Sequence, residues 1–317
     1  MSLKDIDPSG DIKLSELDDM LKEYDSSKNL SEEDMSLIND FFTINMYHYM
    51  VIDKWMWNLV KKYDTLFPPK EPYPSFIYIK KGSADRKNYL EARESNYIEA
   101  SGCEDIIVRQ SVPFIIQSCS KINKPFVIFY IQLVIYDPSE SKTTYHFNLL
   151  VIDFKNEIIF RIEPHGLSAI WNEKIAQCFK SYFAKSGVLD QCKRPLKYID
   201  IPECMKLGPQ HIEQYVPGKD GEIGYCVPWS FMMLEEYLKS NGTKTICQIN
   251  DDIIRVIGDN KTTMMSILPF LPEYRTKDKV IYDGLILIRD KIQKYLIGML
   301  HYANDVSFEA IQALKNK

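Results

Sequence analysis

The hydrophobic and polar positions divide the chain into a helical first part and a strand-rich middle. Apolar residues recur at helical spacing over residues 11–24 and again from Ser31 to about Leu66. Ser31 and the acidic residues after it are typical of a helix start, because a side-chain oxygen and negative charge satisfy the free amides there. A helix of about 35 residues is long for a globular domain, so we expect a break near residues 43–49.

After this helical part, residues 68–100 hold several prolines and a long polar run, and we interpret them as a connection. From about residue 101 the pattern changes to segments rich in β-branched and aromatic residues, which favour strands. The predicted strands are 106–110, 126–137, 145–153, 157–163 and 196–201, and the predicted helices are 168–186, 226–240, 248–257, 281–303 and 306–315. Grouped strands flanked by helices predict an α+β fold, with an N-terminal helical arm over 1–100 and a core over 101–317.

The second predicted helix carries more bulky apolar residues than one amphipathic stripe needs. These residues are Met46, Met50, Trp55, Met56 and Trp57. Packing inside the fold is the plain explanation of this surplus. The alternative is a surface that binds a partner, because exposed apolar surface of this size has to be covered by something.

Composition excludes several classes of protein. The chain of 317 residues has 39 basic and 44 acidic residues, so it lacks the basic surplus that would neutralise nucleic-acid phosphates. No apolar run reaches the ~18 residues of a membrane-spanning helix, and the amino terminus lacks the apolar centre of a signal peptide. The seven cysteines are scattered without a Cys-x-x-Cys pair, which argues against a disulfide framework or a zinc site. We therefore expect an intracellular protein with reduced cysteines.

A predicted hairpin around Lys155–Asn156 brings a histidine and a carboxylate together. Positions whose numbers sum to 311 then lie opposite each other, so His146 faces His165 and Glu163 lies one diagonal step away. Diagonal neighbours are about 7 Å apart at the backbone, within reach of a hydrogen bond between an imidazole and a carboxylate. Asp153 is the competing acid, but it lies about 23 Å along the strand and on the opposite face.

Cys226 begins a predicted buried helix. Gly224 permits a tight approach before it, and Pro228 suits a first helical turn, where a missing amide costs nothing. Free backbone amides and the positive end of the helix dipole stabilise a thiolate at such a position. A nucleophilic thiolate needs a base that is oriented by a third group, and His146 with Glu163 supplies both. The other six cysteines are expected to be small buried hydrophobic residues.

These residues resemble the clan of adenain and the ubiquitin-like-protein-specific proteases. A histidine strand, an acid 17 residues later and a cysteine that opens a helix follow the order of that clan. The strand that begins at His146 is similar to the clan's His-Trp-x-Leu-x-x-Ile-Asp, with Phe147 in place of Trp. The phrases Arg-x-Glu-Pro-His-Gly and Gly-Tyr-Cys-x-x-Trp-Ser look closer still to thiol proteases of giant DNA viruses. The resemblance spans about residues 105–245.

The resemblance implies a papain-like or adenain-like core, in which a mixed sheet is flanked by helices. It also implies an oxyanion-binding Gln about six residues before the cysteine, where this chain has Asp220. We prefer Gln210 for this role, because the Gly-Pro pair before it would fix a loop that presents the side chain. Gln214 is the alternative, and the amide of Cys226 is a donor in either case.

The resulting expectation is a cysteine peptidase, a thiol protease without metal or cofactor. It would hydrolyse peptide or isopeptide bonds through Cys226, His146 and Glu163, in viral precursor proteins or in ubiquitin or ubiquitin-like conjugates. The host cytoplasm or the virion is the expected location, with no nucleic acid and no membrane as partner. Residues 1 to about 95 would lie beside the cleft and help to recognise the substrate. The alternatives are an effector-type acyltransferase with the same triad and an inactive protein-binding scaffold.

Overall fold

The computed structural model describes most of the chain from residue 31 onward. The described residues are 31–43, 45–69, 73–80, 82–83, 86, 96–137, 142–166, 172–192, 194–199, 205, 207–213, 225–255, 279–307 and 309–311. The predicted helix over 11–24, the alternative Gln214, Asp220 and Gly224 therefore lie outside the described residues. In the described part of the chain, no helix combines the length and the apolarity that a membrane crossing requires.

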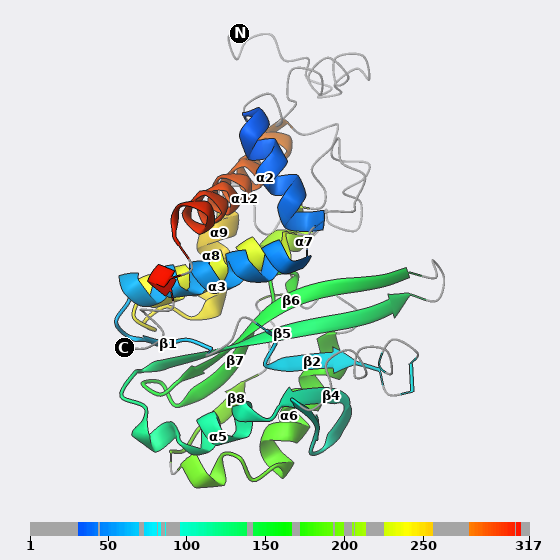
Figure 1. Cartoon of the computed structure of the whole chain (residues 1–317), viewed down its shortest axis with the longest axis vertical. Coiled ribbons are helices and arrows are strands. Elements are labelled where there is room, and N and C mark those ends of the chain that lie inside the picture. The colour runs from blue at the N-terminus through cyan, green and yellow to red at the C-terminus, as the bar shows by residue number, and fades with distance from the viewer. Residues whose placement is uncertain are drawn as a thin grey trace.

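A mixed sheet forms the centre of the molecule (Figure 1). Within the described residues it has eight strands in the order β3-β4-β2-β5-β6-β7-β8, with β1 paired to β5 outside this path. The pairs β1–β5, β2–β5 and β7–β8 are parallel, and the others are antiparallel. The strands are β1 (Leu66–Phe67), β2 (Phe76–Ile79), β3 (Tyr97–Ala100), β4 (Cys103–Arg109), β5 (Phe126–Asp137), β6 (Lys142–Asp153), β7 (Ile158–Ile162) and β8 (Lys197–Ile199).

Helices cover both faces of this sheet (Figure 1). One face carries α2 (Glu32–Thr43), α3 (Asn45–Lys62), α7 (Pro209–Glu213), α8 (Cys226–Lys239), α9 (Ile246–Ile254) and α12 (Lys279–Asp305). The other face carries α5 (Ser111–Gln117) and α6 (Asn172–Lys185), with the short helices η2 (Cys119–Lys121) and η4 (Asp190–Cys192). An apolar core lies on each side, so the predicted α+β class with a mixed sheet flanked by helices is confirmed.

The pattern of predicted elements agrees with most of the structure. The long helical pattern is broken within the predicted window, since α2 ends at Thr43 and α3 begins at Asn45. The predicted strands correspond to β4 through β8, and the predicted later helices correspond to α6, α8, α9 and α12 within a few residues. Of the last predicted helix, 306–315, only residues 309–311 are described as helical.

The interpretation of residues 68–100 as a connection is wrong at two strands. β2 is buried along its length and pairs with both β4 and β5, and β3 pairs with β4. β2 has only four residues, and the prolines before it and the polar run after it hide its pattern. The part of the chain before residue 101 is therefore not all helical. A domain boundary at residue 100 stays a prediction, although the hydrogen bonds of the sheet cross it.

The bulky apolar residues Trp55, Met56 and Trp57 of α3 are used in packing, and the side chain of Met46 lies outside the described part of the structure. Met56 is fully buried and belongs to the core that α3 shares with α8 and α12. The Trp55 ring contacts the rings of Tyr295 and Tyr302 on α12, and its Nε1 donates to the Tyr295 hydroxyl at 3.0 Å. The surplus of apolar bulk is therefore covered largely by the chain itself.

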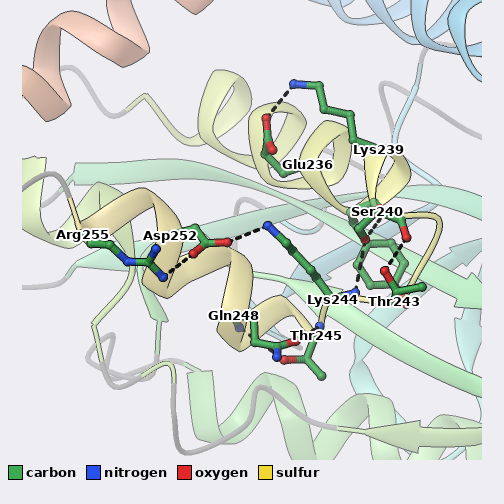
Figure 2. A network of polar contacts seen from close by, with 10 residues as sticks. Glu236, Lys239, Ser240, Thr243, Lys244, Thr245, Gln248, Asp252 and Arg255 are labelled. Atoms are coloured by element: carbon green, nitrogen blue, oxygen red, sulfur yellow. Dashed lines mark hydrogen bonds and ion pairs between the residues drawn. The ribbon is translucent and has the colours of Figure 1, made fainter.

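The end of α8 and the start of α9 are fixed by a polar turn (Figure 2). Ser240 Oγ donates to the carbonyl of Tyr237 at 2.7 Å in the last turn of α8. Thr245 and Gln248 then form a capping box, in which each side chain accepts the backbone N–H of the other residue. Lys244 reaches Asp252 on α9 at 2.8 Å. These contacts satisfy the polar groups at the end of α8 and at the start of α9.

The cysteines are paired, contrary to expectation. Cys103 on β4 bonds to Cys178 on α6, and Cys119 in η2 bonds to Cys192 in η4. Cys247 is also disulfide-bonded. The prediction of reduced cysteines without a disulfide framework is therefore wrong. The partners are 75 and 73 residues apart in the chain, so only the packing of the helices brings their Cα atoms to 5.1 and 5.2 Å, within the range of a disulfide.

Alkylation of the folded protein tests this pairing. Among the cysteines that the structure describes, Cys226 alone is free. Iodoacetamide in the absence of reductant should therefore modify Cys226 and leave Cys103, Cys119, Cys178 and Cys192 as disulfide-linked peptides in mass spectrometry. Modification of these four residues in the native protein, with no linked peptides found, would show that the cross-links are absent.

Candidate active site

The hairpin of β6 and β7 has the predicted register. Leu149 pairs with Ile162 and Asp153 pairs with Ile158, so the paired positions sum to 311. Asp153 holds the turn, because its Oδ1 accepts the N–H groups of Lys155 at 2.8 Å and Asn156 at 2.9 Å. This contact fixes which side chains share a face of the hairpin and places His146 and Glu163 on the same one.

His146 and Glu163 meet just beyond the last paired residues of the hairpin. His146 Nε2 lies 2.7 Å from Glu163 Oε1. The two side chains are 5% and 0% exposed, so water does not screen this interaction. Asp153 instead accepts the Tyr237 hydroxyl at 2.5 Å, far along the strand from His146. The structure thus brings together the predicted pair and leaves the competing acid with a structural role.

The charges of the two groups stabilise each other. Burial acts to raise the pKa of Glu163, but the charge of His146, their hydrogen bond and the charge of Arg161 lower it to about 2. Burial acts to lower the pKa of His146, but the charge of Glu163 and the hydrogen bonds to Cys226 and Glu163 raise it to about 10. At neutral pH the pair is therefore an imidazolium and a carboxylate.

Cys226 is the first residue of α8 and hydrogen-bonds to His146. Because Glu163 occupies Nε2 of the imidazole, Nδ1 is the nitrogen left for the sulfur. The residue before it, Tyr225, is fully buried and offers no side-chain cap to the helix. The free amides of the first turn therefore stay available to an anion. Cys226 itself is half-buried, which leaves its sulfur within reach of a substrate.

A cleft opens beside these residues. Two helices contribute to its lining: α3 with His48 and Tyr49, and α8 with Cys226 and Val227. Two strands contribute as well: β5 with Tyr130 and Gln132, and β6 with Tyr145, His146 and Phe147. Pro74, before β2, completes the lining. The Tyr49 hydroxyl donates to Gln132 Oε1 at 3.3 Å, which ties α3 to the sheet at the rim. Tyr145 is 61% exposed at the same cleft. Of these residues, sequence reasoning found His146 and Cys226 and missed the rest of the wall, for which only the position of Tyr145 next to His146 was a usable signal.

The predicted oxyanion donor, Gln210, lies on α7 beside the end of the hairpin. Its backbone N–H donates to the carbonyl of Pro164 at 3.0 Å, and the N–H of Gly208 donates to the carbonyl of His165 at 3.0 Å. A side chain at Gly208 would collide with the Pro164 carbonyl, so the close approach needs glycine. The Gln210 side chain is buried, and its Oε1 has no hydrogen-bond partner among the described residues. Its role in binding an oxyanion stays a prediction.

The other histidines make different contacts from His146. The ring of His165 lies 5.3 Å from that of His146, and burial together with the His146 charge lowers its pKa to about 3. His48 stacks on Phe41, and burial lowers its pKa to about 4. His301 pairs with Asp34 at 2.8 Å on the surface. In the described part of the chain, no three His, Cys, Asp or Glu side chains are grouped to hold a metal ion.

Comparison with known proteins gives little further guidance. Neither a protein-family model nor a curated protein matches the chain. Among solved structures, the chain is similar to the Chlamydia trachomatis effector protein ChlaDUB1, with 9% identity, a TM-score of 0.40, and coverage of 88% of this chain and 96% of that one.

The ion pair should make stability depend on pH at both ends. Glu163 has an ordinary pKa of 4.5 and a folded pKa of about 2, so its contribution is complete above pH 4.5 and is lost as the pH falls toward 2. His146 has an ordinary pKa of 6.5 and a folded pKa of about 10, so its contribution is complete below pH 6.5 and is lost as the pH rises through 10. We compare the wild type with the His146→Gln/Glu163→Gln variant by urea unfolding. The difference in free energy of unfolding should be largest between about pH 4.5 and 6.5, and a constant difference would contradict the ion pair.

The two candidate acids can be separated by conservative substitutions. Glu163→Gln should slow the alkylation of Cys226 by iodoacetamide about tenfold or more at neutral pH, because an amide cannot stabilise the imidazolium. Asp153→Asn should leave this rate near that of the wild type and lower the free energy of unfolding by about 1–3 kcal/mol, since it weakens the hairpin turn. The opposite ranking of the two rates would assign the acid to Asp153.

Proposed function

We propose that the chain is a cysteine peptidase that cleaves an amide bond through Cys226, with His146 as base and Glu163 as the acid that orients it. One observation carries this proposal: a free sulfur at the start of a buried helix is hydrogen-bonded to an imidazole, which is itself 2.7 Å from a buried carboxylate. A nucleophile, its base and a third group that orients the base are the parts that nucleophilic acyl transfer needs.

In the proposed reaction His146 takes the proton of the Cys226 thiol, and the resulting thiolate attacks the carbonyl carbon of the scissile amide. A sulfur–carbon bond forms, and the carbonyl oxygen becomes an oxyanion. The amide of Cys226 and the side chain of Gln210 are the proposed donors to this oxygen. His146 then passes its proton to the amide nitrogen, the carbon–nitrogen bond breaks, and the amine leaves a thioester behind.

Water completes the cycle. His146 is now neutral, so it can accept a proton from a water molecule that attacks the thioester carbonyl. The carbon–sulfur bond breaks, the carboxylic acid product leaves, and the proton returns to the pair of Cys226 and His146. Glu163 does not exchange a proton in either step; it orients the imidazole and stabilises its charged form.

The cleft supports a polypeptide substrate. Aromatic side chains and Gln132 line the space beside the sulfur, so they offer apolar contact together with a few polar groups to a bound polypeptide. His48 and Tyr49 bring α3 into this wall, which supports a part for the N-terminal helices in recognising the substrate. Two substrate classes fit this proposal: viral precursor proteins, and conjugates of ubiquitin or ubiquitin-like proteins.

Probes that trap the thiol distinguish the two substrate classes. If conjugates are the substrates, ubiquitin or SUMO with a C-terminal propargylamide should form a covalent adduct with the wild type and none with Cys226→Ala. If precursors are the substrates, neither probe should react, and a library of peptides should be cleaved by the wild type only. The substitution removes only the sulfur from a half-buried helix start, so the free energy of unfolding should change by less than about 1 kcal/mol.

Cleavage by Cys226→Ala at the wild-type rate would end the cysteine-peptidase proposal. Asp153→Asn is the matched control, because it alters a buried acid of the same hairpin outside the site and should retain the adduct. If the wild-type thioester were consumed only when an amine or hydroxyl acceptor is added, the products would identify acyl transfer instead of hydrolysis.

A further inference from the structure

A buried arginine stands beside the carboxylate of Glu163. Arg161 lies opposite Leu150 in the hairpin, so its side chain shares a face with Glu163 and with Asn148. Its Nη1 donates to Asn148 Oδ1 at 2.8 Å and to Glu163 Oε2 at 3.3 Å, and its Nη2 donates to Asn172 Oδ1 on α6 at 2.8 Å. Arg161 is only 1% exposed. Burial of a guanidinium is costly, so its presence here calls for a reason other than filling space.

The network around this arginine holds both oxygens of Glu163. Oε1 is bound by the His146 ring and accepts the backbone N–H of His165 at 3.0 Å, and Oε2 accepts from Arg161. Asn172 Nδ2 donates in turn to the carbonyl of Gly166 at 2.5 Å, which ties α6 to the segment after the hairpin. Two strands, one helix and the chain after β7 are therefore joined around a single carboxylate.

Two cations among the described residues contact Glu163. β6 contributes His146, which in turn contacts Cys226 of α8. The segment after β7 contributes His165, whose buried ring is neutral at ordinary pH, with the His211 ring of α7 6.0 Å beyond it. α6 contributes Asn172, which has no charge. Among the described residues, the cations in contact with Glu163 are therefore His146 and Arg161.

These two cations behave differently during the proposed reaction. His146 loses its charge when its proton goes to the leaving nitrogen, and it stays neutral until water delivers another. In this interval a carboxylate beside neutral groups in a dry interior would take up a proton. The guanidinium of Arg161 stays charged throughout, since arginine does not release its proton in proteins.

We propose that Arg161 is a positioning residue that keeps Glu163 ionised and aimed at His146, both in the resting site and while the imidazole is neutral. This inference rests on the proposed function, since the neutral interval belongs to the thioester stage. Arg161 touches neither the substrate nor the sulfur, so it acts through Glu163 alone. It follows that its effect should disappear once Glu163 can no longer ionise.

The test measures the rate of Cys226 alkylation by iodoacetamide against pH. The alkylation rate falls as the pH falls, and we call this part of the profile the acidic limb. In Arg161→Met the limb should move to higher pH. At a fixed pH on the limb, the rate should then fall about tenfold for each pH unit of displacement. Arg161→Lys retains a charge and should keep the limb near its wild-type position. Arg86→Met is the matched control: Arg86 is also buried and paired with a glutamate, Glu99 on β3, away from the site. It should destabilise the fold and leave the limb in place.

A double-mutant cycle separates positioning from simple packing. Arg161→Met should slow alkylation in the wild type and cause little further loss in Glu163→Gln, because both changes disable the same carboxylate. Equal losses in the two backgrounds, or a profile parallel to the wild type at every pH, would overturn the proposal. If Arg161→Met does not fold, Arg161→Gln is measured in the same way. If neither neutral variant folds, a shifted limb in Arg161→Lys would overturn the proposal and an unshifted one would support it.

Failure of this proposal is distinct from failure of the proposed function. Alkylation needs only the thiol, its base and the acid, so it reports positioning even if no peptide is ever cleaved. A peptidase that is active but shows additive losses would refute the role of Arg161 alone. A chain with the non-additive alkylation but no cleavage of any acyl substrate would refute the peptidase and retain the positioning network.

Discussion

The site depends on the burial of two opposite charges, on His146 and Glu163. Each ion loses several kcal/mol of hydration in such an interior, and only a close pair with further hydrogen bonds offsets the loss. The contact of 2.7 Å and the added donors from His165 and Arg161 meet this condition. A shift of the hairpin by one residue would turn these side chains to opposite faces. The turn held by Asp153 supports this register from the far end of the strands, outside the site.

The nucleophile is fixed by a helix from the end of the chain. The hydroxyl of Tyr225, the residue before Cys226, accepts a hydrogen bond from Gln293 of α12 at 3.2 Å. Arg289 of the same helix lies 5.8 Å from the centre of the Tyr225 ring and forms an ion pair with Glu213 at the end of α7. One helix thus braces the start of α8 and the element that carries the proposed oxyanion donor. The resemblance in sequence stops before α12, so this brace was not visible from the motifs.

The sequence predicted those features that depend on neighbouring residues in the chain. The register of the hairpin follows from a turn and a period of two, so the meeting of His146 and Glu163 could be derived before the structure was known. The positions of Asn172 above the hairpin and of Tyr49 in the cleft wall could not, because they depend on how α6 and α3 pack on the sheet. β2 was missed because a strand of four residues between prolines and a polar run shows too little pattern, and its burial comes from partners distant in sequence.

The disulfides constrain where a reactive thiol can lie. A thiolate attacks a disulfide that it can reach, so a nucleophilic cysteine and structural cross-links must be kept apart. The two described disulfides belong to the apolar layer of α5 and α6 on one face of the sheet, whereas Cys226 packs on the layer of the other face. The filled sheet separates these two disulfides from the sulfur, whereas the disulfide-bonded Cys247 packs on the same layer as Cys226. One of these disulfides secures α6, the helix that holds Asn172 beside Arg161. This covalent bond on one face of the sheet therefore helps to hold Glu163 in place, while the sulfur of Cys226 lies on the other face.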